Sequence, residues 1–147
     1  MTEPQPARVR DGLRAITPIG VAAVLFGVSF GVLATAAGMS GLAAVVMSAT
    51  SFAGSSQFAA VSVLDADGAV AAAVGAGLLL NARYAVIGIS VAGTLRGGPG
   101  RRLLASQHVV VESWAVSSRP GGGYDPGLLL GAGLGLYGAW VGGTAIG

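Results

Sequence analysis

The sequence contains no cysteine and no lysine, and it has a single histidine, His108. Without cysteine the chain forms no disulfide and has no thiolate nucleophile or thiolate metal site, and a cysteine–histidine zinc site within one chain is excluded. Charged residues are scarce too, at 10% of the 147 residues, whereas soluble domains average about one quarter. The net charge of +2 is too small to indicate nucleic acid binding.

Patterns typical of hydrolases and nucleotide-binding proteins are also missing. Gly54-Ser55-Ser56 lacks the G-x-S-x-G context of a nucleophile elbow, and no elbow pattern ties His108 to a serine and an aspartate. The glycine-rich stretch at 97–100 is too short for a phosphate-binding loop and is not followed by Lys-Ser/Thr. We therefore predict a protein that is not an enzyme and that uses no cofactor or metal.

Apolar residues dominate what is present, with 53% hydrophobic residues and a mean hydropathy of +0.75. About 20 apolar residues cross a bilayer as a helix, so we predict an all-α integral membrane protein, a polytopic helical bundle. A polar tail over 1–14 precedes the expected segments, which are 16–37, 41–64, 69–95, 103–118 (short) and 127–147. The first segment also resembles a signal peptide but is longer than a usual one. The last apolar segment, 127–147, has no charged or polar residues after it to hold its end at the membrane surface, so we expect the working protein to continue beyond Gly147.

The stretch from Ser48 to Phe58 is unusually polar for a membrane segment and has Gly54 at its centre. One interpretation is a helix-packing face of small residues, whose hydroxyl groups bond their own backbone. The other is a broken or re-entrant helix that lines a cavity, because irregular backbone at membrane depth needs protein or water around it.

The flanking charges favour the re-entrant interpretation of 41–64. Arginines before the first segment place the N-terminus in the cytoplasm by the positive-inside rule. If every segment spanned, Arg96, Arg101 and Arg102 would lie outside and the two aspartates at 65 and 67 inside. The positive-inside rule disfavours both of these placements. If 41–64 enters and leaves on one face, the three arginines lie inside and the two aspartates outside, as the rule favours. Arg119 then lies on the same side as Arg101, so 103–118 would not span either.

Four ionisable or polar side chains in the later segments could carry a function. Asn81 and Arg83 lie near the middle of 69–95, where a charge costs at least about 2.5 kcal/mol. Arg83 either grips a carboxylate or anchors backbone carbonyls of a broken helix. Glu112 could carry a coupling proton, bind an ammonium group, pair with Arg83, or lie in water on an interfacial helix. His108 precedes it by four residues, so on one helix the two would share a face.

Taken together, these motifs resemble the AzlC family, the large subunits of branched-chain amino acid exporters. The resemblance rests on 52–58 (Phe-Ala-Gly-Ser-Ser-Gln-Phe), on Asn81-Ala82-Arg83-Tyr84 and on Glu112-Ser113-Trp114-Ala115, in the family's order and spacing. It runs from about residue 15 to 147. Family members usually have well over 200 residues, and they usually carry Asp where this chain has Val111.

The resemblance implies a secondary transporter subunit in the bacterial cytoplasmic membrane that exports valine, leucine and isoleucine, driven by protons and paired with a small AzlD-type membrane subunit. The expected substrate-binding residues are Ser51, Phe52, Gly54, Ser55, Ser56, Gln57, Asn81 and Arg83, and the proton-coupling candidates are Glu112 and His108. The alternatives are a channel or permease for another small solute, and a truncated membrane subunit that does not transport.

Overall fold

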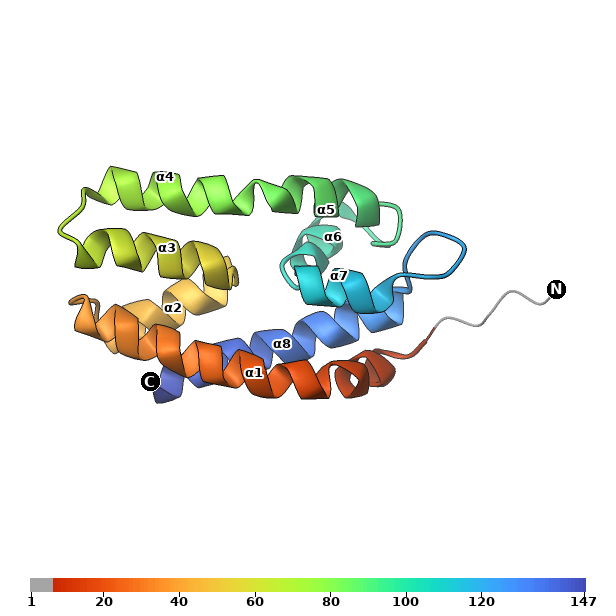
Figure 1. Ribbon diagram of the computed structural model, residues 1–147. Helices are drawn as coiled ribbons and strands as arrows, with labels where there is room; N and C mark the ends of the chain where they lie inside the picture. Colours follow the sequence, from red (N-terminus) through yellow and green to blue (C-terminus); the bar gives the residue numbers. More distant parts are fainter. Residues whose placement is uncertain (1–6) are drawn as a thin grey trace.

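The computed structural model describes residues 7–147, and this part of the chain is built from helices and their connections (Figure 1). The predicted class, an all-α membrane protein, is confirmed. The eight helices in this part are α1 (Val9–Ala36), α2 (Gly41–Ser51), α3 (Gly54–Asp65), α4 (Val70–Asn81), α5 (Arg83–Val91), α6 (Pro99–Ser106), α7 (Val111–Ser117) and α8 (Pro126–Ile146).

Helices α1 and α8 lie side by side along one edge of the molecule, and each is long and apolar enough to cross a membrane (Figure 1). Glycines bring their backbones close together. A Cβ atom added to Gly27 would lie 2.5 Å from the carbonyl oxygen of Trp140 and 3.1 Å from the Cα atom of Gly143. Such close approach between small residues is how helices pack in a bilayer, where apolar burial alone drives little association.

Helices α4 and α5 form a third possible span, bent by 40°. The predicted run 69–95 is therefore interrupted at Ala82, beside the two polar residues Asn81 and Arg83. Sequence alone did not indicate this bend, because neither proline nor glycine occupies position 82.

The predicted segment 41–64 is broken as expected, between α2 and α3. Phe52 adopts left-handed backbone angles with φ of 40°, and Ala53 follows before α3 begins at Gly54. The outer ends of α2 and α3 lie at the same end of the molecule, so the segment enters and returns instead of crossing (Figure 1). This geometry agrees with the re-entrant interpretation of the flanking charges.

The predicted short segment 103–118 contains two helices. The chain enters and leaves this pair at the end of the molecule opposite to the outer ends of α2 and α3 (Figure 1). Helix α6 begins earlier than expected, at Pro99, and the chain leaves the helix after Ser106. Helix α7 then begins near the centre of the molecule and runs outward (Figure 1). The structure thus holds two re-entrant pairs, which approach the centre from opposite ends.

The predicted polar tail 1–14 is helical from Val9 onward, so its second half belongs to α1. Asp11 stabilises this start, because its carboxylate accepts a hydrogen bond from the backbone N–H of Arg8 at 2.9 Å. Residues 1–6 of the expected tail lie outside the described residues.

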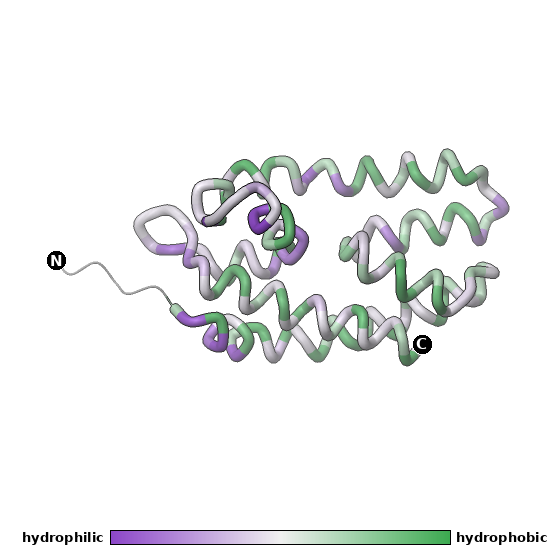
Figure 2. The backbone as a smooth tube through the Cα atoms, turned by 180° about the vertical axis from the view of Figure 1, so that it is seen from behind, coloured by the Kyte–Doolittle hydropathy of each residue, from purple (hydrophilic) through white to green (hydrophobic). Residues whose placement is uncertain are grey.

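Hydrophilic residues lie at the two ends of the molecule and also near its centre, with hydrophobic stretches of helix between them (Figure 2). The α3–α4 connection, which contains Asp67, lies at one end. The α5–α6 and α7–α8 connections, which contain Arg96 and Arg119, lie at the other end with the start of α1 (Figure 1). Acidic and basic connections are therefore separated as the re-entrant topology predicts.

Candidate functional site

The two re-entrant pairs meet near the centre of the molecule and are hydrogen-bonded there. The side-chain amide of Gln107, from the α6–α7 connection, donates to the carbonyl oxygen of Thr50 at 2.5 Å. The hydroxyl of Tyr137 in α8 donates to the carbonyl oxygen of Ala49 at 3.0 Å. These carbonyls end α2 and have no partner inside it, so the break is stabilised by other parts of the protein.

A buried hydroxyl group, that of Ser48, ties the first break to α8. It accepts hydrogen bonds from Gln57 Nε2 at 3.0 Å and from Trp140 Nε1 at 3.2 Å. The Thr144 hydroxyl donates to the backbone of its own helix, so Ser48 donates to Thr144 over 2.9 Å. Gln57 Oε1 in turn accepts the backbone N–H of Ala53 at 3.2 Å. This network holds the interrupted backbone in place.

The first turn of α3 is also tied to the bend between α4 and α5. Arg83 Nη2 donates to the hydroxyl of Ser55 at 2.6 Å, and Ser56 donates to Asn81 Oδ1 at the same distance. No side chain caps α3 at Ala53. The uncapped N–H groups and the positive end of the helix dipole therefore lie beside a guanidinium group at the centre of the molecule.

The larger central cavity, of about 480 Å³, is lined by one cation and one anion, Arg83 and Glu112, and is named here the charged cavity. Gly54 and Ser55 line it from the first turn of α3, and Val111 and Glu112 from the first turn of α7. Arg83 and Glu112 form no ion pair with each other in the described part of the chain. The other lining residues are apolar or aromatic: Ile19, Ala22, Ala23, Phe26, Phe52, Phe58, Tyr84, Val110, Leu136 and Trp140.

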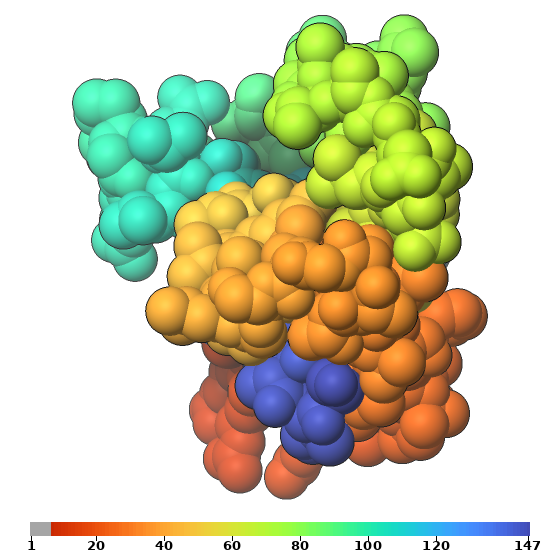
Figure 3. Space-filling model, turned by 90° about the vertical axis from the view of Figure 1, so that its left-hand side faces the viewer, coloured from red at the N-terminus to blue at the C-terminus, as the bar shows by residue number. Residues whose placement is uncertain are grey.

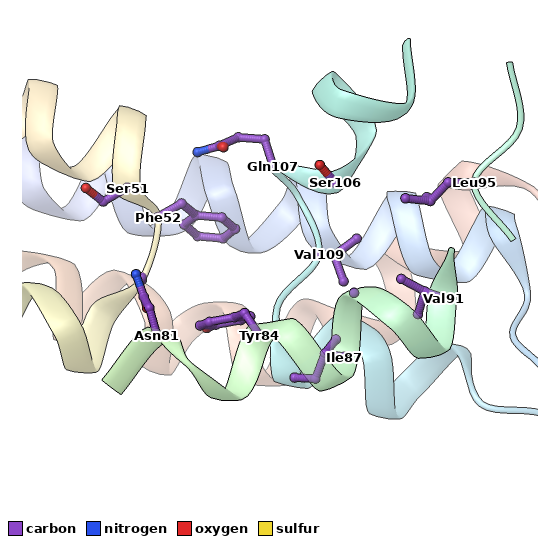
Figure 4. A pocket seen from close by; sticks show the side chains of 12 residues that line it. Ser51, Phe52, Asn81, Tyr84, Ile87, Val91, Leu95, Ser106, Gln107 and Val109 are labelled. Carbon is purple, nitrogen blue, oxygen red and sulfur yellow. The ribbon is translucent and has the colours of Figure 1, made fainter. Parts of the chain in front are cut away.

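A second cavity, of about 380 Å³, adjoins the first at Phe52 and Tyr84, which line both. Its lining contains no charged side chain, and it is named here the uncharged cavity. Figure 4 shows it between the α2–α3 break, helix α5 and the α6–α7 connection. On the surface, α6 stands apart from α3 and α4, and the molecule is hollowed between them above α2 (Figure 3).

His108 does not share a helical face with Glu112, and that expectation was wrong. The helix ends at Ser106, so His108 lies in the connection before α7. Its Nδ1 lies 3.0 Å from the carbonyl oxygen of Leu104, and its ring packs edge-on against Tyr137, with centroids 5.1 Å apart. His108 lines neither of the two cavities.

A family model described as AzlC protein matches residues 18–147, which is most of the chain. The chain belongs to the AzlC family. The resemblance seen in the three sequence motifs is thereby confirmed, and all three motifs contribute residues to the charged cavity of this AzlC protein.

A relative of this AzlC protein from Archaeoglobus fulgidus, described as an uncharacterized membrane protein, is 34% identical over 146 residues. The match covers 96% of the AzlC chain and 62% of the relative, so the chain spans about 62% of that protein's length. No solved structure matches the chain.

Most of the residues predicted to bind substrate line one of the two cavities of the AzlC chain. Those at the charged cavity are Phe52, Gly54, Ser55 and Arg83, together with the proton-coupling candidate Glu112, and those at the uncharged cavity are Ser51, Phe52 and Asn81. Ser56 and Gln57 line neither of these two cavities but a third one of about 290 Å³, and their side chains bond Asn81 and the Ser48 network.

Sequence reasoning missed several residues of the AzlC site, for different reasons. Tyr84 directly follows Arg83 in the motif, so its place near Arg83 could have been predicted. The run of β-branched residues at 109–111 disfavours a helix and could have indicated the break before Glu112. Trp140 was not predicted as a site residue, because it reaches the cavity through the packing of α8 against the α2–α3 break.

Proposed function

We propose that this AzlC protein carries the binding site of a secondary transporter that exports branched-chain amino acids (valine, leucine and isoleucine) in a proton-coupled manner. The observation that supports this most is the presence of Arg83 and Glu112 in one cavity between interrupted helices. An amino acid is a zwitterion, and both of its charges need partners when it leaves water. A cavity with one fixed charge of each sign meets that need.

The substrate carboxylate is proposed to bind at Arg83 and the first turn of α3. The hydrogen bond from Arg83 to Ser55 uses one guanidinium donor, and a guanidinium has five. The remaining donors can hold a carboxylate in a two-point contact, which a lysine could not reproduce. The uncapped N–H groups of α3 add a favourable dipole at the same place, as half-helix ends do in other transporters.

The substrate ammonium group is proposed to bind at Glu112, which lines the same cavity from the first turn of α7. Glu112 can bind an ammonium group only while it is ionised, so protonation of this carboxylate and release of the substrate would be linked. Coupling to protons then needs only this one side chain in the cavity. His108 stays a second candidate in the proton path and would need a movement of the 107–110 connection.

A small AzlD-type subunit is proposed to cover part of this site. Arg83 and Glu112 are exposed in the isolated chain. A charge facing lipid costs at least about 2.5 kcal/mol, so another protein segment over these side chains would be stabilising. We propose the bacterial cytoplasmic membrane as the location, with the arginine-rich end and the N-terminus inside.

The test is efflux of radiolabelled valine from cells that express the chain with and without an AzlD-type subunit. Arg83→Ala should reduce efflux to background while the protein still inserts, because the carboxylate loses its partner. The matched control is Arg96→Ala in the α5–α6 connection, which should keep parental efflux. Parental efflux in Arg83→Ala would remove Arg83 from the mechanism.

The same experiment, extended to a panel of amino acids and small uncharged solutes, separates the alternative functions. Efflux of an uncharged solute without any amino acid would support a channel or permease. No difference between expressing and control cells for any compound would support a membrane subunit that does not transport, and would overturn the proposed function.

A further inference from the structure

We propose that the uncharged cavity is the subsite for the aliphatic side chain of the substrate, and that Gly88 in α5 sets its capacity. The proposal rests on the proposed function, because it assumes an amino acid held by its charged ends in the charged cavity. It assigns the choice among amino acids mainly to the aliphatic lining of this cavity and to Gly88, which lie outside the three sequence motifs.

No charged side chain lines the uncharged cavity, and three of its polar side chains make internal hydrogen bonds. Gln107 Nε2 donates to the Thr50 carbonyl, and Asn81 Oδ1 accepts from Ser56. The hydroxyl of Ser106 donates to a carbonyl of its own helix at 2.8 Å. A charged group that entered this cavity would lose its hydration and find no side chain of opposite charge in the lining.

The remaining surface suits an aliphatic group. Ile87, Val91 and Leu95 line the cavity from the α5 side, and Val109 faces them from the α6–α7 connection (Figure 4). The volume of about 380 Å³ is roughly a dozen times the ~30 Å³ that one water takes up in the liquid. A branched side chain of three or four carbons therefore fits with room to spare.

The two cavities are adjacent in a way that fits one molecule across both. Phe52 and Tyr84 line each of them, so a solute can place its charged ends between Arg83 and Glu112 and its side chain past these two rings. Phe52 takes its position from the left-handed backbone at the break, and its ring packs edge-on against Tyr137, with centroids 5.2 Å apart. The α2–α3 break thus contributes to both subsites.

Gly88 allows a direct test, because it lines the uncharged cavity and a Cβ atom added to it meets no atom within 4 Å. A larger side chain at 88 would occupy the cavity without pushing on its neighbours. Gly75 in α4 is a matched control: an added Cβ atom there also meets nothing within 4 Å, and Gly75 lines neither cavity.

The experiment measures the ratio of leucine to alanine efflux in cells expressing the parent, Gly88→Val or Gly75→Val, so that differences in expression cancel. A hydrophobic pocket discriminates one methylene group by about tenfold or more, so we expect Gly88→Val to lower the ratio on the order of tenfold. Gly75→Val should leave it unchanged. A ratio for Gly88→Val within about twofold of the parent would overturn the proposal.

A second variant covers the case in which Gly88→Val fails to fold. Ile87→Ala enlarges the same cavity and should raise phenylalanine efflux relative to leucine efflux, and an unchanged ratio would overturn the subsite. These outcomes differ from failure of the proposed function, in which the parent itself exports no amino acid.

Discussion

Ser48 is the residue on which the polar interior of the α2–α3 break depends. Its side chain is fully buried and bonds Gln57, Trp140 and Thr144, which come from two other helices. Hydrogen bonds between membrane helices contribute about 0.6 kcal/mol each on average, and an unpaired buried donor costs more. We therefore expect Ser48→Ala to destabilise the protein by about 2 kcal/mol or more.

Thermal unfolding of the purified protein in detergent would measure this effect. Thr50→Ala is the matched control in the same helix, because the Thr50 hydroxyl is exposed and bonds a carbonyl of its own helix at 2.7 Å. It should change stability by less than about 0.5 kcal/mol. Equal effects of the two substitutions would show that the Ser48 network contributes nothing specific.

Asp125 is the other residue with many partners, and it lies at the arginine-rich end, before the α8 span begins. Its carboxylate accepts hydrogen bonds from the backbone of Ala7, Gly127 and Leu128 and from the Arg119 guanidinium at 2.6 Å. Burial alone would raise the pKa of Asp125. The hydrogen bonds from Ala7, Arg119 and the first turn of α8 outweigh burial and hold the pKa below the ordinary 3.8.

A pKa that is lower in the folded than in the unfolded state makes Asp125 stabilising at neutral pH. Asp125→Asn should cost about 2 kcal/mol at pH 7, because it removes a charge that accepts several hydrogen bonds. The difference from the parent should persist down to about pH 3.8 and disappear as the pH falls through the folded-state pKa. Melting temperatures measured against pH would check this, with Asp65→Asn in exposed surroundings as the control.

At the residue scale, sequence identified which polar side chains matter but not what each one does. Gln57 and Arg83 both stood out as polar groups in apolar runs. The structure buries Gln57 in a network that holds the backbone, whereas Arg83 lines a cavity. This distinction depends on contacts between helices far apart in sequence, which spacing along one helix cannot reveal.

At the element scale, the break at 52–53 was predictable and the bend at Ala82 was not. A central glycine within a polar stretch marked the first, and the aspartates and arginines on its flanks indicated that the segment returns. No helix-breaking residue marked the second, where Ser55 and Ser56 of α3 bond the residues on either side of the bend. Helix α7 was missed because a segment of 16 residues was treated as one helix.

The α1–α8 pair offers a prediction at the same scale. A side chain at Gly27 would collide with the backbone of Trp140 and Gly143, so Gly27→Val must push the two helices apart. We expect a loss of about 3 kcal/mol, at the upper end of the usual cost of overpacking, because backbone atoms cannot move aside as side chains can. Gly20→Val in the same helix, where an added Cβ atom meets nothing within 4 Å, should retain the parental melting temperature. Equal stability of the two variants would contradict close packing at Gly27.

At the scale of the whole molecule, the two re-entrant pairs determine how the chain meets the membrane. They approach the centre from opposite ends, so only α1, the bent α4–α5 pair and α8 run from one end to the other (Figure 1). The interrupted helices can then face a cavity, while the helices that run from end to end surround them. The backbone groups freed at the breaks are thereby kept away from lipid and can find partners in protein or water. Most of the arginines collect at one end as a direct result.

This topology predicts which positions share a side of the membrane. The chain has no cysteine, so single cysteines introduced by Ala36→Cys, Ala66→Cys, Gly98→Cys and Gly121→Cys can each be labelled alone with an impermeant maleimide. Positions 36 and 66 should react in intact cells, because α2 and α3 return to the side that they left. Positions 98 and 121 should react only after permeabilisation, because α6 and α7 do the same at the arginine-rich end. If every segment crossed the membrane, each of these two pairs would be split between the two sides.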